Sequence, residues 1–323
     1  MMKNFAYVRA SSVAEAIKAL STKGAYLHAG GTYLLGCMQD EIFQVEKVVS
    51  ISNSKELKGI AERPDGGVKI GALTTLADIA SNASVAGKYA VLAQAAADVG
   101  SPQLREQGTI GGNICQRSRC WYYRADFRCM KKGGDICSAQ WGENQYHAVF
   151  GGKGCFAVHP SDVAVALAAL QAQLTIAGPA GSKPVKIDSF FVGPDKTVEK
   201  ENILLPGEIV TEINLPALSG KIRSSYRKIR ARAAWDFALT SVGVVLQFEN
   251  DNVSKARIVL GGVAPYPWRV EAAEKLLIGK KIDRALASAA GQASTTGASP
   301  LRDNAYKVDM LKGAIEEALL AFA

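Results

Sequence analysis

The chain has 323 residues, of which 48% are hydrophobic and 21% are charged, and its formal net charge is +8. This composition excludes an intrinsically disordered protein, and the length predicts two domains. The basic residues form no tail or long run, which argues against nucleic-acid binding. No apolar run reaches the roughly 20 residues that span a bilayer, and the N-terminus shows no signal-peptide pattern. We therefore expect no nucleic-acid partner, no membrane segment and no export signal of the chain's own.

The predicted elements of the first half follow a βαβ-like order. Residues 1–56 contain three strands separated by two helices, with Ser11 or Ser12 as the first N-cap. The pattern restarts with a strand and two helices, for which Thr74 and Ser84 are the expected N-caps. A further helix and strand follow a cysteine-rich region. The predicted ranges are strands 5–8, 26–29, 47–51, 67–73 and 173–178, and helices 13–21, 33–39, 76–82, 85–99 and 163–172.

The second half has a different character. Residues 179–215 mix short strands with Pro, Gly and charge, so we expect a domain boundary between Gly178 and Pro216. Long strands and then helices follow, which is typical of an α+β domain with an antiparallel sheet. The predicted ranges are strands 224–231, 237–249 and 254–264, and helices 270–278 and 305–322.

Two glycine pairs lie in the segments AGGT (29–32) and TIGGN (109–113). Glycines let the backbone approach a ligand closely and leave N–H groups free for phosphate oxygens. The Thr109 hydroxyl and the Asn113 carboxamide add polar groups to the second segment. Neither segment has the GxGxxG spacing of a dinucleotide-binding turn, and each alone is typical of an ordinary turn or loop. Together, they suggest a clamp for the two halves of a diphosphate.

Five of the six cysteines lie between residues 108 and 162. A disulfide scaffold is typical of much shorter secreted domains and is not expected in a chain of this length. Their spacing lacks the close pairs of zinc sites but is compatible with an iron–sulfur cluster. Unligated cysteines remain an alternative, and the surrounding basic residues also fit a solvated face or an RNA-binding loop. Cys37 and Cys115 are expected to be small buried hydrophobic residues. The candidate ligands are Cys120, Cys129, Cys137 and Cys155.

Two further segments carry candidate polar residues. In HPSD, Asp162 either caps a helix or accepts a hydrogen bond from a ribose hydroxyl. In YRKIR, alternation places Tyr226, Lys228 and Arg230 on one face of a strand. Lys228 could offset the charge of a reduced flavin, or it could be an ordinary surface lysine. No nucleophile elbow, P-loop or HExxH motif is present, so a hydrolase or kinase has little support.

Taken together, AGGT, TIGGN, HPSD, YRKIRAR and LGGVAPYPWR resemble the flavin subunit of the xanthine dehydrogenase family of molybdenum hydroxylases. The resemblance covers nearly the whole chain. It implies an α+β fold, in which a two-lobed FAD-binding domain of the vanillyl-alcohol-oxidase (PCMH) type occupies residues 1–216. Its subdomains are expected at about 1–56 and 57–178. A C-terminal α+β domain like that of the CO dehydrogenase flavoproteins, with an antiparallel sheet, is expected over 217–323.

The resemblance also implies an FAD site. The two glycine segments are expected to hold the diphosphate, Asp162 the adenosine end, and Lys228 to lie near the isoalloxazine ring. Tyr33 stands where the family usually has Asp or Asn. The implied FAD-binding residues are Tyr26, Leu27, His28, Ala29, Gly30, Gly31, Thr32, Tyr33, Leu34, Thr109, Gly112, Asn113, Ser118, Asp162, Val210 and Lys228.

Two branches of this family carry an additional [4Fe-4S] cluster in the flavin subunit: 4-hydroxybenzoyl-CoA reductase and the bacterial periplasmic aldehyde oxidoreductase. The run from QRSRC to HPSD is more similar to the aldehyde branch, and the reductase remains the alternative within the family. The resemblance implies that Cys120, Cys129, Cys137 and Cys155 bind the cluster in a loop insertion of about 115–157. The alternative from a different class is a basic binding module with structural zinc.

The implied function is electron transfer within a molybdenum-dependent aldehyde oxidoreductase. Partner subunits would carry the molybdenum cofactor and two [2Fe-2S] clusters, and electrons would pass through FAD to an external acceptor. No catalytic acid–base residue is expected in this chain. The family also implies a periplasmic location through co-export with a signal-bearing partner, or a cytoplasmic one otherwise.

Overall fold

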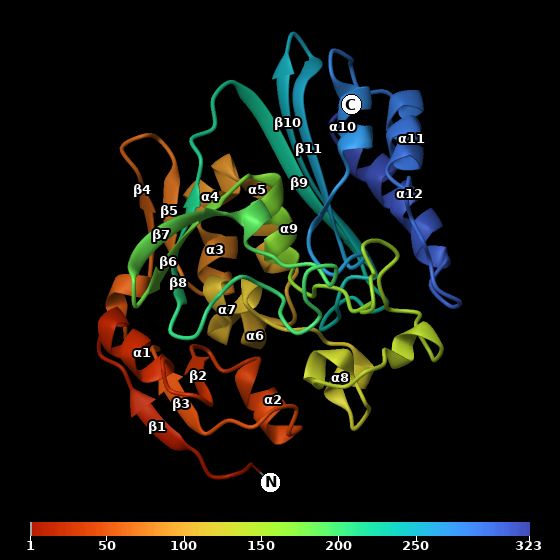
Figure 1. The fold of residues 1–323 in the computed structure, drawn as a ribbon. Helices are drawn as coiled ribbons and strands as arrows, with labels where there is room; N and C mark the ends of the chain where they lie inside the picture. The colour runs from red at the N-terminus through yellow and green to blue at the C-terminus, as the bar shows by residue number, and fades with distance from the viewer. Residues whose placement is uncertain (1) are drawn as a thin grey trace.

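The computed structural model describes residues 2–323, and its N-terminal lobe is a three-stranded parallel sheet of order β1-β3-β2 (Figure 1). The Ser12 side chain accepts a hydrogen bond from the Glu15 amide and so caps the first helix, as predicted. The βαβ-like order predicted for this lobe is confirmed. Its elements are β1 (Ala6–Arg9), α1 (Val13–Leu20), β2 (Ala25–His28), α2 (Leu34–Gln39), β3 (Lys47–Ser50) and the 3₁₀ helix η1 (Lys55–Leu57).

A five-stranded antiparallel sheet of order β4-β5-β8-β6-β7 forms the second unit. Strand β8 (Ile209–Leu215) pairs with both β5 and β6, so the segment between Gly178 and Pro216 belongs to this sheet. The remaining members are β4 (Ile60–Glu62), β5 (Val68–Gly71), β6 (Gln173–Gly178), β7 (Gly181–Lys186) and the 3₁₀ helix η4 (Ile187–Ser189).

The helices of the second unit differ from the prediction in two respects. Thr75 and Asn82 cap α3 and α4, so the expected caps Thr74 and Ser84 are wrong. The helix predicted over 85–99 is broken at Tyr89, whose side chain is buried and donates a hydrogen bond to the Pro216 carbonyl. The helices are α3 (Leu76–Ser81), α4 (Ala83–Lys88), α5 (Ala90–Ala97), α6 (Pro102–Gln107), α7 (Ile110–Ile114) and α9 (Asp162–Ala169).

The C-terminal unit is an antiparallel sheet of order β12-β11-β10-β9, as the run of long strands predicts. Helices α10 and α12 pack against this sheet, α11 packs on both of them, and α5 and α9 also contact the sheet (Figure 1). Every residue of α9 is buried, because this helix lies within the largest hydrophobic core. The elements are β9 (Lys221–Ile229), β10 (Thr240–Glu249), β11 (Asn252–Gly261), β12 (Trp268–Arg269), α10 (Glu271–Leu277), α11 (Arg284–Ala293) and α12 (Tyr306–Leu320).

The cysteine-rich insertion is mostly loop. It contains α8 (Trp121–Arg124) and two 3₁₀ helices, η2 (Met130–Lys132) and η3 (Ser138–Gln140). It lies outside the two larger sheets, between the N-terminal lobe and the C-terminal unit (Figure 1). Across residues 2–323, every helix is too short or too polar to cross a membrane.

Candidate FAD cavity and cysteine loop

A cavity of about 520 Å³ opens where the N-terminal lobe, the second unit and the β9–β10 loop meet. All of the predicted FAD-binding residues except His28 and Ser118 line it. Ser118 is buried beside Cys155 in a separate small cavity, and its Oγ accepts a hydrogen bond from the Cys120 amide. A cavity of this size and mixed polarity suits a large cofactor. The fold therefore assembles most of the predicted set, from segments far apart in the chain.

The AGGT turn requires glycine at both positions, one for lack of space and the other for its backbone conformation. A Cβ atom on Gly30 would lie 1.6 Å from the Gln107 carbonyl oxygen, so no other residue fits without moving the backbone. Gly31 has a φ of +73°, in the left-handed region that favours glycine. This turn therefore packs directly against the chain that leads into TIGGN. The two segments lie side by side on one cavity, as a diphosphate clamp requires.

The second segment departs from the prediction in its local structure. Residues 110–114 form helix α7, and the Thr109 hydroxyl caps it by accepting from the Gly112 amide. The amides of Ile110 and Gly111 donate to the Thr74 and Ala72 carbonyls. The expectation that these amides are free for phosphate oxygens is therefore wrong. The Asn113 carboxamide oxygen accepts from Ser161 Oγ at 2.5 Å, which ties α7 to the start of α9.

Asp162 and Lys228 form a buried ion pair beside the cavity, with 2.7 Å between Lys228 Nζ and Asp162 Oδ2. Tyr226 donates its hydroxyl proton to Asp162 Oδ1 at 2.6 Å, while Ser161 takes the N-cap role. Burial raises the pKa of Asp162, and Lys228 opposes this effect without cancelling it. The predicted alternation is confirmed, because Arg230 also points to this side and pairs with Asp98.

This ion pair changes one expectation for the FAD site. The resemblance assigns Asp162 to the adenosine end and Lys228 to the isoalloxazine end of the cofactor. Two groups 2.7 Å apart would contact the same part of an extended dinucleotide. Lys228 is also buried rather than exposed, so the interpretation as an ordinary surface lysine is wrong.

The loop between β9 and β10 contributes cavity residues that the sequence analysis missed. Trp235 and Phe237 line the cavity, and the Trp235 amide donates to the Gly100 carbonyl at 3.0 Å. Trp235 is 68% exposed and Phe237 is 44% exposed, so two large aromatic side chains lie at the surface beside the cavity. Two large aromatic residues within a short loop next to a candidate site were a usable signal in the sequence.

The four predicted cluster ligands lie in one region of the insertion. Cys129 and Cys137 face each other in an isolated antiparallel bridge. The pKa of Cys120 is raised to about 12 and that of Cys155 to about 11, mainly by burial, and the neighbouring cysteines make only a smaller contribution in the same direction. Such like-charge effects require the thiols to be close to one another. Thiols near one another, of which Cys155 is buried and the other three are partly buried, fit a shared metal cluster, whose positive irons would stabilise thiolates.

The arrangement does not fit a single ion. Within residues 2–323, no group of three or more His, Cys, Asp or Glu side chains converges closely enough to hold one metal ion. All six cysteines are unpaired. Cys37 is fully buried, as expected, although its Sγ accepts a hydrogen bond from Arg124 at 3.1 Å. Cys115 packs against the main core but is only partly buried, because it also lines the FAD cavity.

A second cavity, of about 450 Å³, connects the cysteine loop to the FAD cavity. Cys120 lines it from the loop side. Arg119, Asp162 and Phe237 line both this cavity and the FAD cavity. The insertion therefore borders the candidate flavin site directly.

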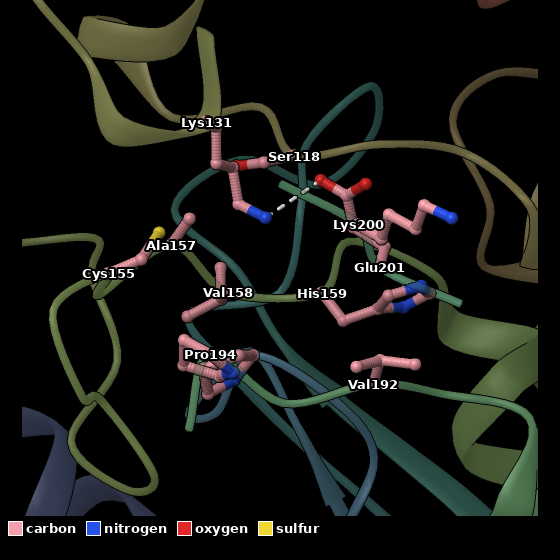
Figure 2. A pocket seen from close by; sticks show the side chains of 11 residues that line it. Ser118, Lys131, Cys155, Ala157, Val158, His159, Val192, Pro194, Lys200 and Glu201 are labelled. Atoms are coloured by element: carbon pink, nitrogen blue, oxygen red, sulfur yellow. Dashed lines mark ion pairs between the residues drawn. The ribbon is translucent and has the colours of Figure 1, made fainter. Parts of the chain in front are cut away.

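A small cavity of about 10 Å³ lies beside Cys155 and has room for about one water. Figure 2 shows the side chains that line it. Glu201 lies beside it and pairs with Lys131 at 3.0 Å and with Arg117 at 2.8 Å. Burial raises the pKa of Glu201, but the two cations lower it by more, so the net pKa lies below the usual range. Glu201 thus joins the start of the cysteine insertion, at Arg117, and its η2 segment, at Lys131, to the chain beyond β7.

Replacing Glu201 with glutamine is expected to lower the free energy of unfolding by about 2–3 kcal/mol at pH 7. A depressed carboxyl pKa stabilises the folded state above the unfolded pKa, and this contribution disappears as the pH falls through the folded pKa. The difference between the two proteins should therefore shrink in acid, measured by urea unfolding between pH 7 and pH 3. Glu199→Gln, at an exposed neighbour, is the control and should change stability by less than about 0.5 kcal/mol. A pH-independent difference would contradict this assignment.

Tyr33 connects the FAD cavity to the cysteine loop. The guanidinium carbons of Arg119 and Arg124 lie 5.4 Å and 5.3 Å from the centre of its ring. The same ring lines the FAD cavity. An aspartate or asparagine at this position offers no aromatic face to these cations. The departure from the usual family residue therefore has a structural role in this chain.

Tyr33→Leu is expected to loosen the insertion, because two cation–π contacts of about 0.5–1 kcal/mol each are lost. Limited proteolysis should cut residues 115–157 faster in this variant than in the wild type. Tyr33→Phe keeps the ring and should retain wild-type resistance. Equal cleavage rates in all three proteins would show that the ring does not hold the loop.

A two-lobed first domain with a large cavity, followed by an antiparallel α+β unit, is the architecture that the resemblance to FAD-binding subunits implies. Residues 3–218 match the family model described as the FAD binding domain in molybdopterin dehydrogenase. Residues 224–322 match the CO dehydrogenase flavoprotein C-terminal domain. The chain belongs to the FAD-binding subunits of the xanthine dehydrogenase and CO dehydrogenase family. The predicted α+β fold and FAD cofactor are thereby confirmed.

Individual relatives support the same assignment. The chain is 37% identical to the aldehyde oxidoreductase FAD-binding subunit PaoB of Escherichia coli (strain K12), over 98% of both chains. It is 31% identical to the carbon monoxide dehydrogenase medium chain of Hydrogenophaga pseudoflava, over 98% of this chain and 96% of that one. A solved carbon monoxide dehydrogenase from H. pseudoflava has a TM-score of 0.78 at 29% identity, covering 100% and 99% of the two chains. The alternative of a basic module with structural zinc has no such support.

Proposed function

We propose that this chain is the electron-transfer subunit of a molybdenum-dependent aldehyde oxidoreductase and that it holds FAD and one [4Fe-4S] cluster. The observation that carries the proposal is the placement of the cysteine loop, in which Cys129 forms a β-bridge with Cys137 and Cys120 lines the cavity that borders the FAD site. The likeness to an aldehyde oxidoreductase subunit favours an aldehyde as the substrate of the complex. Catalysis on that substrate is assigned to another subunit.

The residues of this chain position and insulate the two cofactors. When bound, FAD exchanges two electrons with an acceptor and single electrons with iron–sulfur clusters. Gly30 and Gly31 form one part of the lining of the FAD cavity. The Asp162–Lys228 ion pair forms another part, in which the two charges neutralise each other. Cys120, Cys129, Cys137 and Cys155 would hold the cluster. Arg119 lies between the two sites, where its positive charge stabilises added electrons.

We propose a molybdenum-cofactor subunit and a [2Fe-2S] subunit as partners, with an external electron acceptor. Exposed large hydrophobic side chains are concentrated on the cysteine insertion, where Phe127, Ile136, Trp141 and Tyr146 are each at least 45% exposed. Such a concentration is typical of a protein interface. Co-export with a signal-bearing partner would place the complex in the periplasm, and cell fractionation after expression with and without that partner tests this.

A visible absorption spectrum of the purified chain, with iron and acid-labile sulfide analysis, tests the cofactor content. We expect flavin bands over a broad thiolate-to-iron absorption, with about four iron atoms and four sulfides per flavin. Flavin without iron or sulfide would contradict the cluster. Aldehyde-dependent reduction of the flavin in the assembled complex tests the substrate class.

Cys129→Ser is expected to lose most of the iron and to retain FAD, because the ligand lies outside the FAD cavity. Iron and flavin per chain are measured on the same sample. Cys115→Ser is the control, since Cys115 lines the FAD cavity but lies outside the proposed ligand set. It should keep its iron. Parallel loss of iron and FAD in Cys129→Ser would argue against separate sites.

A further inference from the structure

A histidine contacts one of the proposed cluster ligands. His147 Nε2 lies 3.2 Å from the Sγ atom of Cys120, although the two residues are 27 positions apart. The imidazole is 3% exposed and packs edge-on against Trp121. Its other nitrogen, Nδ1, is buried and has no hydrogen-bond partner in the described chain. Nε2 is therefore the ring nitrogen with a polar neighbour, and that neighbour is a sulfur atom.

The C-terminal unit holds the His147 segment in place. Asn304 Nδ2 donates to the His147 carbonyl at 3.1 Å and to the Ala148 carbonyl at 3.3 Å. Lys307 Nζ donates to the Tyr146 carbonyl at 3.1 Å and to the Gly262 carbonyl at 2.8 Å. Asn304 and Lys307 are both fully buried. These contacts fix the backbone that carries the imidazole, so its position does not depend on the cluster loop alone.

A thiolate that ligates iron accepts hydrogen bonds and donates none. An imidazole offers its Nε2–H to such a sulfur either as the cation or as the neutral tautomer protonated at Nε2. Hydrogen bonds to the sulfurs of a cluster stabilise its reduced state, because reduction adds negative charge that the sulfurs share. Donors of this kind are a general means by which proteins tune a metal centre.

We propose that His147 is a positioning residue that donates an Nε2–H···S hydrogen bond to Cys120 and raises the reduction potential of the cluster. This inference rests on the proposed [4Fe-4S] site. The C-terminal unit holds the donor through Asn304 and Lys307, so this unit helps to set the potential of a centre that it does not itself ligate.

The test is an EPR-monitored redox titration of the assembled complex with three variants. His147→Phe keeps a ring against Trp121 but removes the donor, and we expect a lower cluster potential at wild-type iron content. His147→Gln retains an N–H donor and should lie closer to the wild type. Tyr146→Phe, on the adjacent exposed side chain, is the matched control and should leave the potential unchanged. The FAD potential should stay the same in all of them.

A second measurement keeps the proposal falsifiable if His147→Phe does not retain iron. In wild-type protein labelled with ¹⁵N-histidine, pulsed EPR of the reduced cluster should show a weak nitrogen coupling. Absence of that coupling, or an unchanged potential in an iron-replete His147→Phe variant, would overturn the proposal. An equal shift in the Phe and Gln variants would also overturn it, because packing rather than hydrogen bonding would then be responsible. Wild-type protein without iron would instead refute the cluster site itself.

Discussion

Gly30→Ala is expected to abolish FAD retention and to lower the free energy of unfolding by about 1–3 kcal/mol or more. The added methyl group would lie 1.6 Å from the Gln107 carbonyl oxygen, and a backbone atom cannot rotate away as a side chain can. The turn must therefore move away from the segment that precedes α7. This movement separates the two glycine segments that border the FAD cavity.

The measurements are the ratio of flavin to protein absorbance after gel filtration and the unfolding of both proteins after FAD removal. Unfolding of the apo forms separates damage to the fold from the stability that bound FAD contributes. Gly36→Ala is the matched control, because a Cβ there meets nothing within 4 Å and the residue lies within α2. It should keep FAD and gain about 0.5–1 kcal/mol. Full flavin retention in Gly30→Ala would show that the close contact is not required.

Lys228→Met is expected to have the second large effect, a loss of about 3–5 kcal/mol in the free energy of unfolding near pH 8. The substitution leaves the Asp162 carboxylate buried with Tyr226 as its remaining hydrogen-bond donor. Lys228 lowers the pKa of Asp162, so without this lysine burial raises that pKa further above its usual range. A raised carboxyl pKa makes stability fall as pH rises from the unfolded pKa to the folded one. The loss should therefore be smaller at pH 5 than at pH 8, measured by urea unfolding.

Asp162→Asn combined with Lys228→Met gives a double-mutant cycle for the same pair. Removing both charges leaves no uncompensated ion, and the Tyr226 hydroxyl can still donate to the asparagine oxygen. The double variant should therefore be more stable than the sum of the single effects predicts. Strict additivity would show that the two side chains do not act as a buried pair. Both single variants should also bind FAD less tightly, because both side chains line its cavity.

Much of the fold was predictable from local patterns. The strand at 173–178 begins and ends as expected, and the βαβ-like lobe and the C-terminal antiparallel sheet both form. Alternation also placed Tyr226 and Lys228 correctly on one side of β9, with Arg230, the residue after this strand, on the same side. The break at Tyr89 was not predictable, because it depends on a hydrogen bond to Pro216, which lies 127 positions away.

The sequence by itself determined the composition of the site: two glycine pairs, a cysteine group, one carboxylate and one lysine, each recognisable by residue type and spacing. Those signals are local, because they reflect backbone freedom, side-chain chemistry and strand or helix periodicity. Tertiary structure decided which of these groups meet. It joined Asp162 to Lys228 and hydrogen-bonded the first amides of α7 to carbonyl groups of the protein. It also brought Tyr33 against the cysteine loop and His147 against Cys120 within that loop. Such contacts depend on packing between distant segments, and no local pattern in a single sequence encodes them.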